Sequence, residues 1–428
     1  MDILDAVAPL LRVSQLCNLW QWRVDPSARL LQRFRWLELY SLVILFASSG
    51  YLLYGLFDES RDESDEGGNE TSNIGHTVDY IQLVGIRVAH ITSLLEALWQ
   101  RQTQQRFFAQ LREIDRDFAS MLHIDVDNAK LRQQMTRRGL WMLAGYIISQ
   151  SFIIVTKMFS PDHKFPIYWI CYLLPLLVCG LRYFQIYTAV LIVHQRLELL
   201  HKLLESLQLN EADPQKPYAC MCIKEALQMQ VAAAACMQRL ITARILYQRL
   251  WLLVGLLNRC YGLSMLFNLG NDFLAITSNC YWIFLNFRQF AASPYDFMQI
   301  LGSTLWTTPH LGNVLALALM CERAAYFTTR LALSLHHIRV DLQNDSHNAL
   351  VSFNFYCPFL LVRNKLLLQI TQFSLQLLHQ RLCFSAAGFF NVDCTLLYTI
   401  VGATTTYLII LIQFHMSEIS FSNASDGA

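Results

Sequence analysis

The stretch of sequence that decides the fold runs from residue 388 to residue 416 and reads GFFNVDCTLLYTIVGATTTYLIILIQFHM. Its only charged residue is Asp393, and a helix of about 20 apolar residues is enough to cross a bilayer. Six further apolar runs precede it. The seven predicted transmembrane spans are Leu37–Phe57, Val78–Leu98, Leu140–Phe159, Ile167–Val193, Trp251–Leu274, Gln299–Met320 and Gly388–Met416. We therefore predict an all-α membrane protein with seven transmembrane helices.

The composition supports this fold class. Of the 428 residues, 54% are hydrophobic and 15% are charged, whereas about 25% of the residues in a typical soluble domain are charged. This excludes a disordered protein and argues against an ordinary cytosolic enzyme. The net charge of +1 provides no global basic field, so we expect no nucleic-acid partner.

The positions of Lys and Arg predict which way the helices run, because short cytoplasmic loops collect basic residues. The segments 1–36, 99–139, 194–250 and 321–387 together hold 26 of the 33 basic residues. The loops between the opposite ends of the spans hold three. We therefore predict that the N-terminus lies inside the cell and the C-terminus outside.

This topology divides the chain into five parts. Residues 1–36 form a cytoplasmic segment, 37–320 hold helices one to six, and 321–387 return to the cytoplasm. Residues 388–416 form the seventh helix and 417–428 a short extracellular tail. The first outer loop, 58–77, is acidic and Gly-rich, and it contains the sequence Asn69-Glu70-Thr71. We predict that Asn69 is glycosylated, because the sequon lies on the outer side.

The predicted inner segments are long and amphipathic. Parts of 99–139, 194–250 and 364–384 carry apolar residues at spacings of three and four with charged residues between them, which is typical of helices. We therefore expect the spanning helices to extend well into the cytoplasm and to pack there. Two interpretations remain open, namely caps on the bundle and a domain through which subunits associate.

Within the seventh span, small and polar residues fall on one narrow stripe. At 100° per residue, one set of residues lies within about 40° of Gln413. The set is Asn391, Thr395, Thr399, Gly402, Thr406, Ile409 and Ser417. One interpretation is close helix packing in lipid. The other is the lining of a pore in which Ile409 and Ile410 form a constriction that gates by dewetting. One helix cannot enclose a pore, so this interpretation requires several subunits in a ring.

Residues 406–414, TYLIILIQF, resemble the signature of the insect gustatory receptors, which is Thr-Tyr, five hydrophobic residues and Gln-Phe in the last transmembrane helix. Residues 388–390 also look like the start of that helix in the family. The resemblance covers the whole chain, because length, seven spans, inner N-terminus, long inner segments and short outer tail all agree. The sugar-receptor branch often carries an acidic residue where this chain has Leu408, which favours a receptor for bitter or other non-sugar compounds.

The resemblance implies a tastant-gated, non-selective cation channel in the plasma membrane of chemosensory neurons. The channel would be a tetramer of this chain alone or of this chain with related subunits. Residues 37–320 would form the ligand-binding bundle, 321–387 the helical anchor and 388–416 the pore-lining helix. The pore and gate residues carried onto this chain are Thr399, Thr406, Ile409, Ile410 and Gln413. Tyr407 and Phe414 would pack behind the pore.

A tastant pocket requires apolar and aromatic walls with a few fixed polar groups. The candidates in the outer halves of the helices are Tyr146, Gln150, Tyr172, Asn271, Asp272 and Trp306. A carboxylate at membrane depth costs about 2.5–3.5 kcal/mol on insertion scales, so Asp272 should face the bundle interior or water. Ionised, it would attract a cationic or polyhydroxylated ligand. The alternative is a structural ion pair with Arg182 or Arg259.

Other chemistry finds little support in the sequence. The adjacent residues His336 and His337 point about 100° apart on a helix, and Cys220 and Cys222 make half a metal site at most. We expect no metal, no cofactor and no enzymatic activity. A G-protein-coupled receptor would place its N-terminus outside, against the charge pattern. An odorant-type receptor of the same superfamily is the nearer alternative, and the intact motif in 406–414 favours the gustatory branch.

Overall fold

A computed structural model of the chain describes residues 1–24, 31–65, 73–158, 173–207, 223–289, 294–350 and 357–425. These residues are almost entirely helical, as predicted. Two short antiparallel hairpins accompany the helices, β1 (Trp22–Val24) with β2 (Leu31–Arg33) and β3 (Ser385–Ala386) with β4 (Phe390–Asn391). The helices are α1 (Ile3–Leu16), α2 (Arg35–Asp65), α3 (Asn73–Trp99), α4 (Arg101–Leu122), α5 (Asn128–Met158), α7 (Leu174–Ser206), α8 (Ile223–Gln289), α9 (Pro294–Leu350), α10 (Cys357–His379) and α11 (Cys394–Ser425).

The seven predicted spans fall in order on α2, α3, α5, α7, α8, α9 and α11. Within the described residues, four helical segments are long and apolar enough to cross a membrane by length and composition. They are Thr77–Trp99, Leu174–Ser206, Ala234–Phe287 and Cys394–Ser417. The second, fourth, fifth and seventh predicted spans therefore coincide with continuous helices among the described residues.

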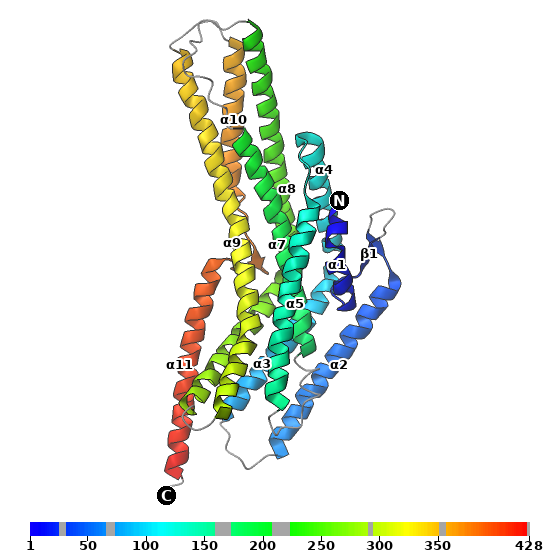
Figure 1. Cartoon of the computed structure of the whole chain (residues 1–428), viewed down its shortest axis with the longest axis vertical. Helices are drawn as coiled ribbons and strands as arrows, with labels where there is room; N and C mark the ends of the chain where they lie inside the picture. Colours follow the sequence, from blue (N-terminus) through cyan, green and yellow to red (C-terminus); the bar gives the residue numbers. More distant parts are fainter. Residues whose placement is uncertain are drawn as a thin grey trace.

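The two longest helices extend far beyond any bilayer. Helix α8 has 67 residues and α9 has 57, which at 1.5 Å per residue makes them about 100 and 85 Å long. The hydrocarbon core of a bilayer is about 30 Å thick. Figure 1 shows the remaining parts of α8 and α9 running beside α10 as a narrow stalk at one end of the molecule. The helical extension of the spans thus agrees with the sequence pattern.

The N-terminal segment is folded, which the sequence did not predict. The carboxylate of Asp2 accepts a hydrogen bond from the backbone N–H of Leu4 at 3.1 Å and so caps α1. The apolar face of α1 is buried, and Arg112 of α4 forms an ion pair of 2.9 Å with Asp2. Trp22 of β1 donates to the carbonyl of Arg101 at 2.9 Å. These contacts attach the first 24 residues to the bundle.

The seventh helix begins later than predicted. The prediction placed its start at Gly388, but residues 388–391 form a turn and strand β4, and α11 starts at Cys394. The Asp393 carboxylate accepts from the backbone N–H of Thr395 at 2.9 Å, which is how an N-cap residue starts a helix. Asn391 therefore lies outside the helix and does not belong to the polar stripe.

The hairpin before α11 is bound to α8. Asn258 of α8 donates to the carbonyl of Cys383 at 2.8 Å and accepts from the N–H of Ser385 at 3.2 Å. Burial and the Asp393 carboxylate raise the pKa of the Cys383 thiol above its ordinary value, so the thiol stays protonated and can donate to the Asn391 side chain at 2.8 Å. The start of α11 is therefore positioned by α8.

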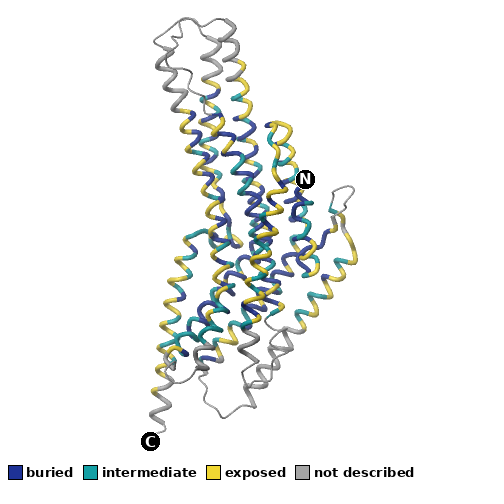
Figure 2. The backbone as a smooth tube through the Cα atoms, in the orientation of Figure 1, coloured by how far each residue is buried: buried dark blue, intermediate teal, exposed yellow. Residues whose placement is uncertain are grey.

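One large apolar core runs along α7, α8 and α9 and includes residues of α1, α4, α5 and α10. Figure 2 shows buried residues concentrated along this central axis, while exposed residues dominate on α11 and on the described part of α2. Helix α11 thus lies at the periphery of its own chain, whereas α8 passes through the centre.

Candidate functional site

Helix α11 contacts the rest of the chain mainly through one face that packs against α8. Thr404 is buried, and its hydroxyl lies 3.4 Å from that of Thr277 on α8. The rings of Tyr407 and Phe273 lie 5.8 Å apart in an edge-to-face arrangement, and those of His415 and Tyr281 lie 6.1 Å apart. The α8 partners are spaced four residues apart, so they form one ridge of the helix.

The predicted pore residues lie on exposed parts of α11. Thr399, Thr406, Ile409, Ile410 and Gln413 are all exposed in the single chain. So are other faces of the helix, because only 6% of its most apolar 18-residue window is buried. Exposure therefore agrees with the predicted stripe without distinguishing a pore from a lipid-facing or subunit-facing surface.

Two threonine hydroxyls of the stripe form hydrogen bonds within the helix. Thr399 donates to the carbonyl of Thr395 at 3.1 Å, and Thr406 donates to that of Gly402 at 3.0 Å. Such bonds let threonine tolerate a surface without water. The Gln413 side chain forms no hydrogen bond with any of the described residues. The amide of Gln413 therefore requires a partner outside this chain or water.

The candidate pocket residues come together in part. Trp306 of α9 is buried in a small cluster with Ile86 of α3 and Leu176 of α7, and Tyr146 of α5 packs against this cluster. The Tyr146 hydroxyl donates to the carbonyl of Leu173 at 3.0 Å. Four helices therefore converge around two of the candidate residues, Tyr146 and Trp306. Tyr172 and Asn69 lie outside the described residues.

Asp272 of α8 faces the bundle interior, as expected, and is 3% exposed. Its Oδ1 lies 2.7 Å from Nδ1 of His310 on α9, and its Oδ2 accepts a hydrogen bond from the Tyr183 hydroxyl on α7. The suggested ion pair with Arg182 or Arg259 is wrong, because Arg182 pairs with another carboxylate and Arg259 is exposed. The sequence contains His310 and Tyr183, but no local spacing connects them to a residue on α8.

Several buried polar atoms around this region have no hydrogen-bond partner within the described residues. They are Nη1 of Arg87 on α3, Nε2 of Gln150 on α5, Oδ1 of Asn271 on α8 and Nε2 of His310 on α9. Buried polar groups are nearly always paired, so each such atom calls for water or a ligand. Gln150 and Asn271 were candidates from the sequence, whereas His310 was missed.

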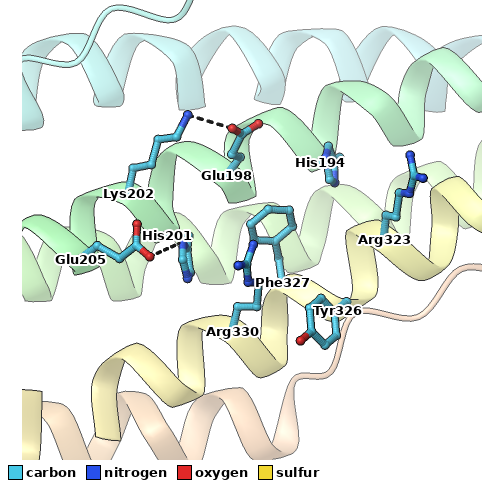
Figure 3. A pocket seen from close by; sticks show the side chains of 9 residues that line it. All are labelled: His194, Glu198, His201, Lys202, Glu205, Arg323, Tyr326, Phe327 and Arg330. Atoms are coloured by element: carbon cyan, nitrogen blue, oxygen red, sulfur yellow. Dashed lines mark hydrogen bonds and ion pairs between the residues drawn. The ribbon is translucent and has the colours of Figure 1, made fainter. Parts of the chain in front are cut away.

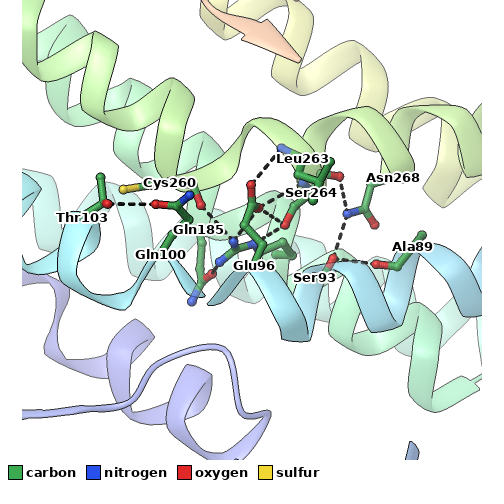
Figure 4. Close-up of polar contacts among 11 residues, drawn as sticks. Ala89, Ser93, Glu96, Gln100, Thr103, Gln185, Cys260, Leu263, Ser264 and Asn268 are labelled. Atoms are coloured by element: carbon green, nitrogen blue, oxygen red, sulfur yellow. Dashed lines mark hydrogen bonds and ion pairs between the residues drawn. The ribbon is translucent and has the colours of Figure 1, made fainter. Parts of the chain in front are cut away.

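A second cluster of buried polar side chains lies between α3, α7 and α8 (Figure 4). It contains Glu96, the carboxylate that pairs with Arg182. Arg182 of α7 forms an ion pair of 2.9 Å with Glu96 of α3, and both side chains are almost fully buried. Glu96 also accepts hydrogen bonds from the backbone N–H groups of Leu263 and Ser264 at 2.8 and 3.0 Å. The Arg182 guanidinium lies 4.6 Å from the ring of Tyr261. The two residues are 86 positions apart in the chain, and no sequence pattern connects them.

Both members of the ion pair contact backbone groups of α8. Arg182 donates to the carbonyl of Cys260 at 3.2 Å, and in a regular helix that carbonyl would accept from Ser264. The N–H of Ser264 donates to Glu96. Side chains inserted into the ladder are a recognised cause of helix bends. Beyond this point the lower part of α8 lies beside α11 (Figure 1).

Two adjacent residues of α8 therefore connect the two parts of the candidate site, which are the bundle interior and α11. Asp272 points to α7 and α9, and the next residue, Phe273, contacts Tyr407 of α11. Successive helical residues differ by 100°, so a small rotation of α8 would alter both contacts together. The arrangement can transmit a change in the bundle to the last helix.

The chain is similar in sequence to known receptors. The family model of the 7tm chemosensory receptors matches residues 7–367 and 359–418. Gustatory receptor 2a of Drosophila melanogaster is 58% identical over 435 aligned positions, which cover 100% of each chain. A gustatory receptor for bitter taste of the same species, 66a, is 48% identical over 48 residues, which are 11% of this chain and 9% of that protein.

A solved structure shares the fold. The insect olfactory receptor OR5 from Machilis hrabei matches with a TM-score of 0.63 at 11% sequence identity, covering 96% of this chain and 98% of the other. The same receptor in complex with eugenol matches with a TM-score of 0.60. At this identity the likeness concerns the fold alone. It confirms the all-α, seven-transmembrane architecture predicted from the sequence.

Proposed function

Since the chain belongs to the 7tm chemosensory receptor family and within it to the insect gustatory receptors, we propose that it is a subunit of a cation channel gated by a tastant. The proposed ligand site lies among α3, α5, α7, α8 and α9, around Asp272 and Trp306. The proposed pore is lined by α11, with Gln413 and the constriction at Ile409 and Ile410. The channel is a tetramer, formed by this chain alone or with related subunits, in the plasma membrane of chemosensory neurons.

The observation that carries the proposal is the position of α8 between the two sites. Asp272 contacts His310 and Tyr183 in the bundle, while the neighbouring Phe273 contacts Tyr407 in the family motif. A ligand that pairs with the unsatisfied atoms of Gln150 and Asn271 would separate side chains that now pack together, and α8 would pass that displacement to α11. A conformational change requires such a difference in ligand contacts between two states.

Two features support the ligand class and the branch of the family. Leu408 occupies the position where sugar receptors often carry an acidic residue, and the short match to a bitter-taste receptor points the same way. We therefore propose bitter or other non-sugar compounds as ligands. The full-length identity to a gustatory relative favours this branch over an odorant receptor, since the olfactory neighbour shares the fold at 11% identity.

Whole-cell recording tests the proposal directly. Cells that express the chain at the surface are exposed to bitter, sweet and amine compounds, and the current is recorded for the native chain and for Gln413→Ala. We expect a cation current whose permeation or gating changes with Gln413→Ala. Thr405→Ala is the matched control, because Thr405 is exposed on the same helix about 80° away from Gln413.

Two results would argue against the channel. The first is a response carried by second messengers without any current of its own. The second is a current that Gln413→Ala and Thr405→Ala leave equally unchanged, which would remove α11 from the pore. Co-expression with related receptor subunits distinguishes a missing partner from a wrong ligand panel.

A further inference from the structure

A cavity of about 450 Å³ lies between α7 and α9, away from the candidate tastant site. Figure 3 shows its charged lining, in which Glu198, Lys202 and Glu205 come from α7 and Arg323 and Arg330 from α9. His194, His201, Tyr326 and Phe327 complete the lining. A volume of this size is typical of a small-molecule site, and the lining differs from the apolar walls around Trp306.

The cavity begins where the predicted membrane spans end. The fourth predicted span ends at Val193, one residue before His194, and the sixth ends at Met320, three residues before Arg323. On the neighbouring α5, Arg138 lies two residues before the third span, and its guanidinium is 5.4 Å from the ring of Tyr187 on α7. Arg138 and Arg323 therefore lie close to the ends of their predicted spans, on the side that the charge pattern assigns to the cytoplasm, and Lys202 and Arg330 lie further along α7 and α9. The end of the cavity at His194 and Arg323 therefore lies at the predicted depth of the lipid headgroups of the inner leaflet, and the cavity extends from there into the cytoplasm.

Two arginines of the cavity have no carboxylate partner among the described residues, and the guanidinium of one of them, Arg330, lies 5.9 Å from the centre of the Phe327 ring. Lys202 lies 2.8 Å from Glu198, and His201 lies 3.5 Å from Glu205. No carboxylate of the described residues comes within ion-pair distance of Arg323 or Arg330. These two arginines are seven residues apart, so they project from the same face of α9 about 10 Å apart along its axis. Both are exposed. Guanidinium groups bind phosphate oxygens through paired hydrogen bonds.

The carboxylates define the ligand further. A simple anion would be repelled by Glu198 and Glu205, whereas a ligand that also bears hydroxyl groups can donate hydrogen bonds to them. The lining thus suits a molecule with phosphate groups at one end and hydroxyls beside them. We propose that this cavity binds the phosphorylated inositol headgroup of an anionic lipid in the inner leaflet. The proposal rests on the predicted orientation of the chain and is independent of channel activity.

Binding of a short-chain phosphatidylinositol bisphosphate with a fluorescent label to the full-length receptor in neutral detergent tests this site. A hydrogen bond to a charged group changes affinity by about tenfold or more, so Arg323→Gln should weaken binding about tenfold and the double variant with Arg330→Gln about 100-fold. Arg339→Gln is the matched control, because Arg339 is exposed on the opposite face of α9. Size-exclusion chromatography verifies that each variant remains folded.

Two further arms identify the ligand chemistry and its source. Short-chain phosphatidylserine should bind at least tenfold more weakly, and Glu198→Gln with Glu205→Gln should reduce that difference. Soluble inositol trisphosphate should compete only weakly if the membrane supplies the headgroup, and as well as the lipid if the cytosol supplies it. Equal binding of both lipids would overturn the proposal. So would an unchanged affinity in the double arginine variant, or an equal loss in Arg339→Gln.

Discussion

The ring of Phe273 on α8 meets the ring of Tyr407 on α11 edge to face, with 5.8 Å between the centroids and 69° between the planes. Phe273 follows Asp272, the carboxylate that contacts α7 and α9. The same helical turn therefore joins the bundle interior to the family motif. The first prediction tests this junction.

Removing either ring should change gating. An edge-to-face pair contributes about 0.5–1.5 kcal/mol beyond its buried area, so Phe273→Ala and Tyr407→Ala should each shift the open–closed equilibrium. The double variant should differ from the sum of the single variants by an amount in this range. Dose–response currents provide the measurement. Tyr398→Ala is the control, because Tyr398 is 80% exposed on the same helix. Strict additivity would mean that the two rings are not coupled.

Charge at Asp272 should decide the response to cationic tastants. Asp272→Asn keeps the shape of the side chain and removes its charge. Hydrogen bonds to charged groups contribute about 1.5–3 kcal/mol, so potency should fall at least about tenfold for a cation and less for a neutral compound. The control is Asp117→Asn, since the Asp117 carboxylate pairs with Arg249 at 2.6 Å, outside the candidate site. Unchanged potency for every active compound would remove Asp272 from the ligand site.

The buried pair of Glu96 and Arg182 should dominate the stability of the bundle. Removing one partner of a buried ion pair costs about 3–5 kcal/mol, because the other charge is left uncompensated. We therefore expect Glu96→Ala to lower the unfolding temperature of the detergent-solubilised receptor strongly. Replacing both residues by Met should recover much of the loss. Arg249→Gln breaks a partly exposed pair and should cost less than about 1 kcal/mol. A loss in Glu96→Ala no larger than in Arg249→Gln would contradict this account.

A methyl group at Gly262 should disturb the attachment of α11. A Cβ atom there would lie 3.0 Å from the backbone nitrogen and 3.1 Å from the Cα of Ala387, in the turn that leads to α11. Backbone atoms cannot move away as easily as a flexible side chain, so Gly262→Ala should destabilise the protein and alter gating. Gly255→Ala on the same helix has open space and should be neutral or stabilising by up to about 1 kcal/mol. Equal unfolding temperatures would show that the turn adapts freely.

Hydropathy and the helical repeat were enough to predict the helices of this chain. Long apolar runs must form helices in lipid, because each backbone polar group must be paired within its own segment. The same reasoning failed at residue 388, because an apolar run does not reveal where a turn ends. The boundary depends on the Asp393 cap and on the contact of Asn258 with the hairpin, and the second of these is a tertiary contact.

The candidate site was predictable only by residue type. Asp272 was identified because a carboxylate in an apolar run has to face the interior, but its partners could not be deduced. Tyr183 and His310 lie 89 and 38 residues away, and Arg182, a chemically better partner, binds Glu96 instead. The choice between partners depends on how α3, α7 and α8 cross, and one sequence carries no record of that geometry.

The small contact area of α11 has a thermodynamic consequence. Only 6% of the residues in its apolar window are buried within its own chain, so a small part of the free energy that fixes its position comes from within one molecule. In the proposed channel, contacts with neighbouring copies supply the rest of the free energy that fixes α11. By mass action, this stabilisation grows with the logarithm of the subunit concentration in the membrane. Helix α11, which lines the proposed pore, would then be the first element to lose its order when few copies are present. The amount of receptor in a sensory membrane would set how many intact pores exist as well as how many binding sites are available.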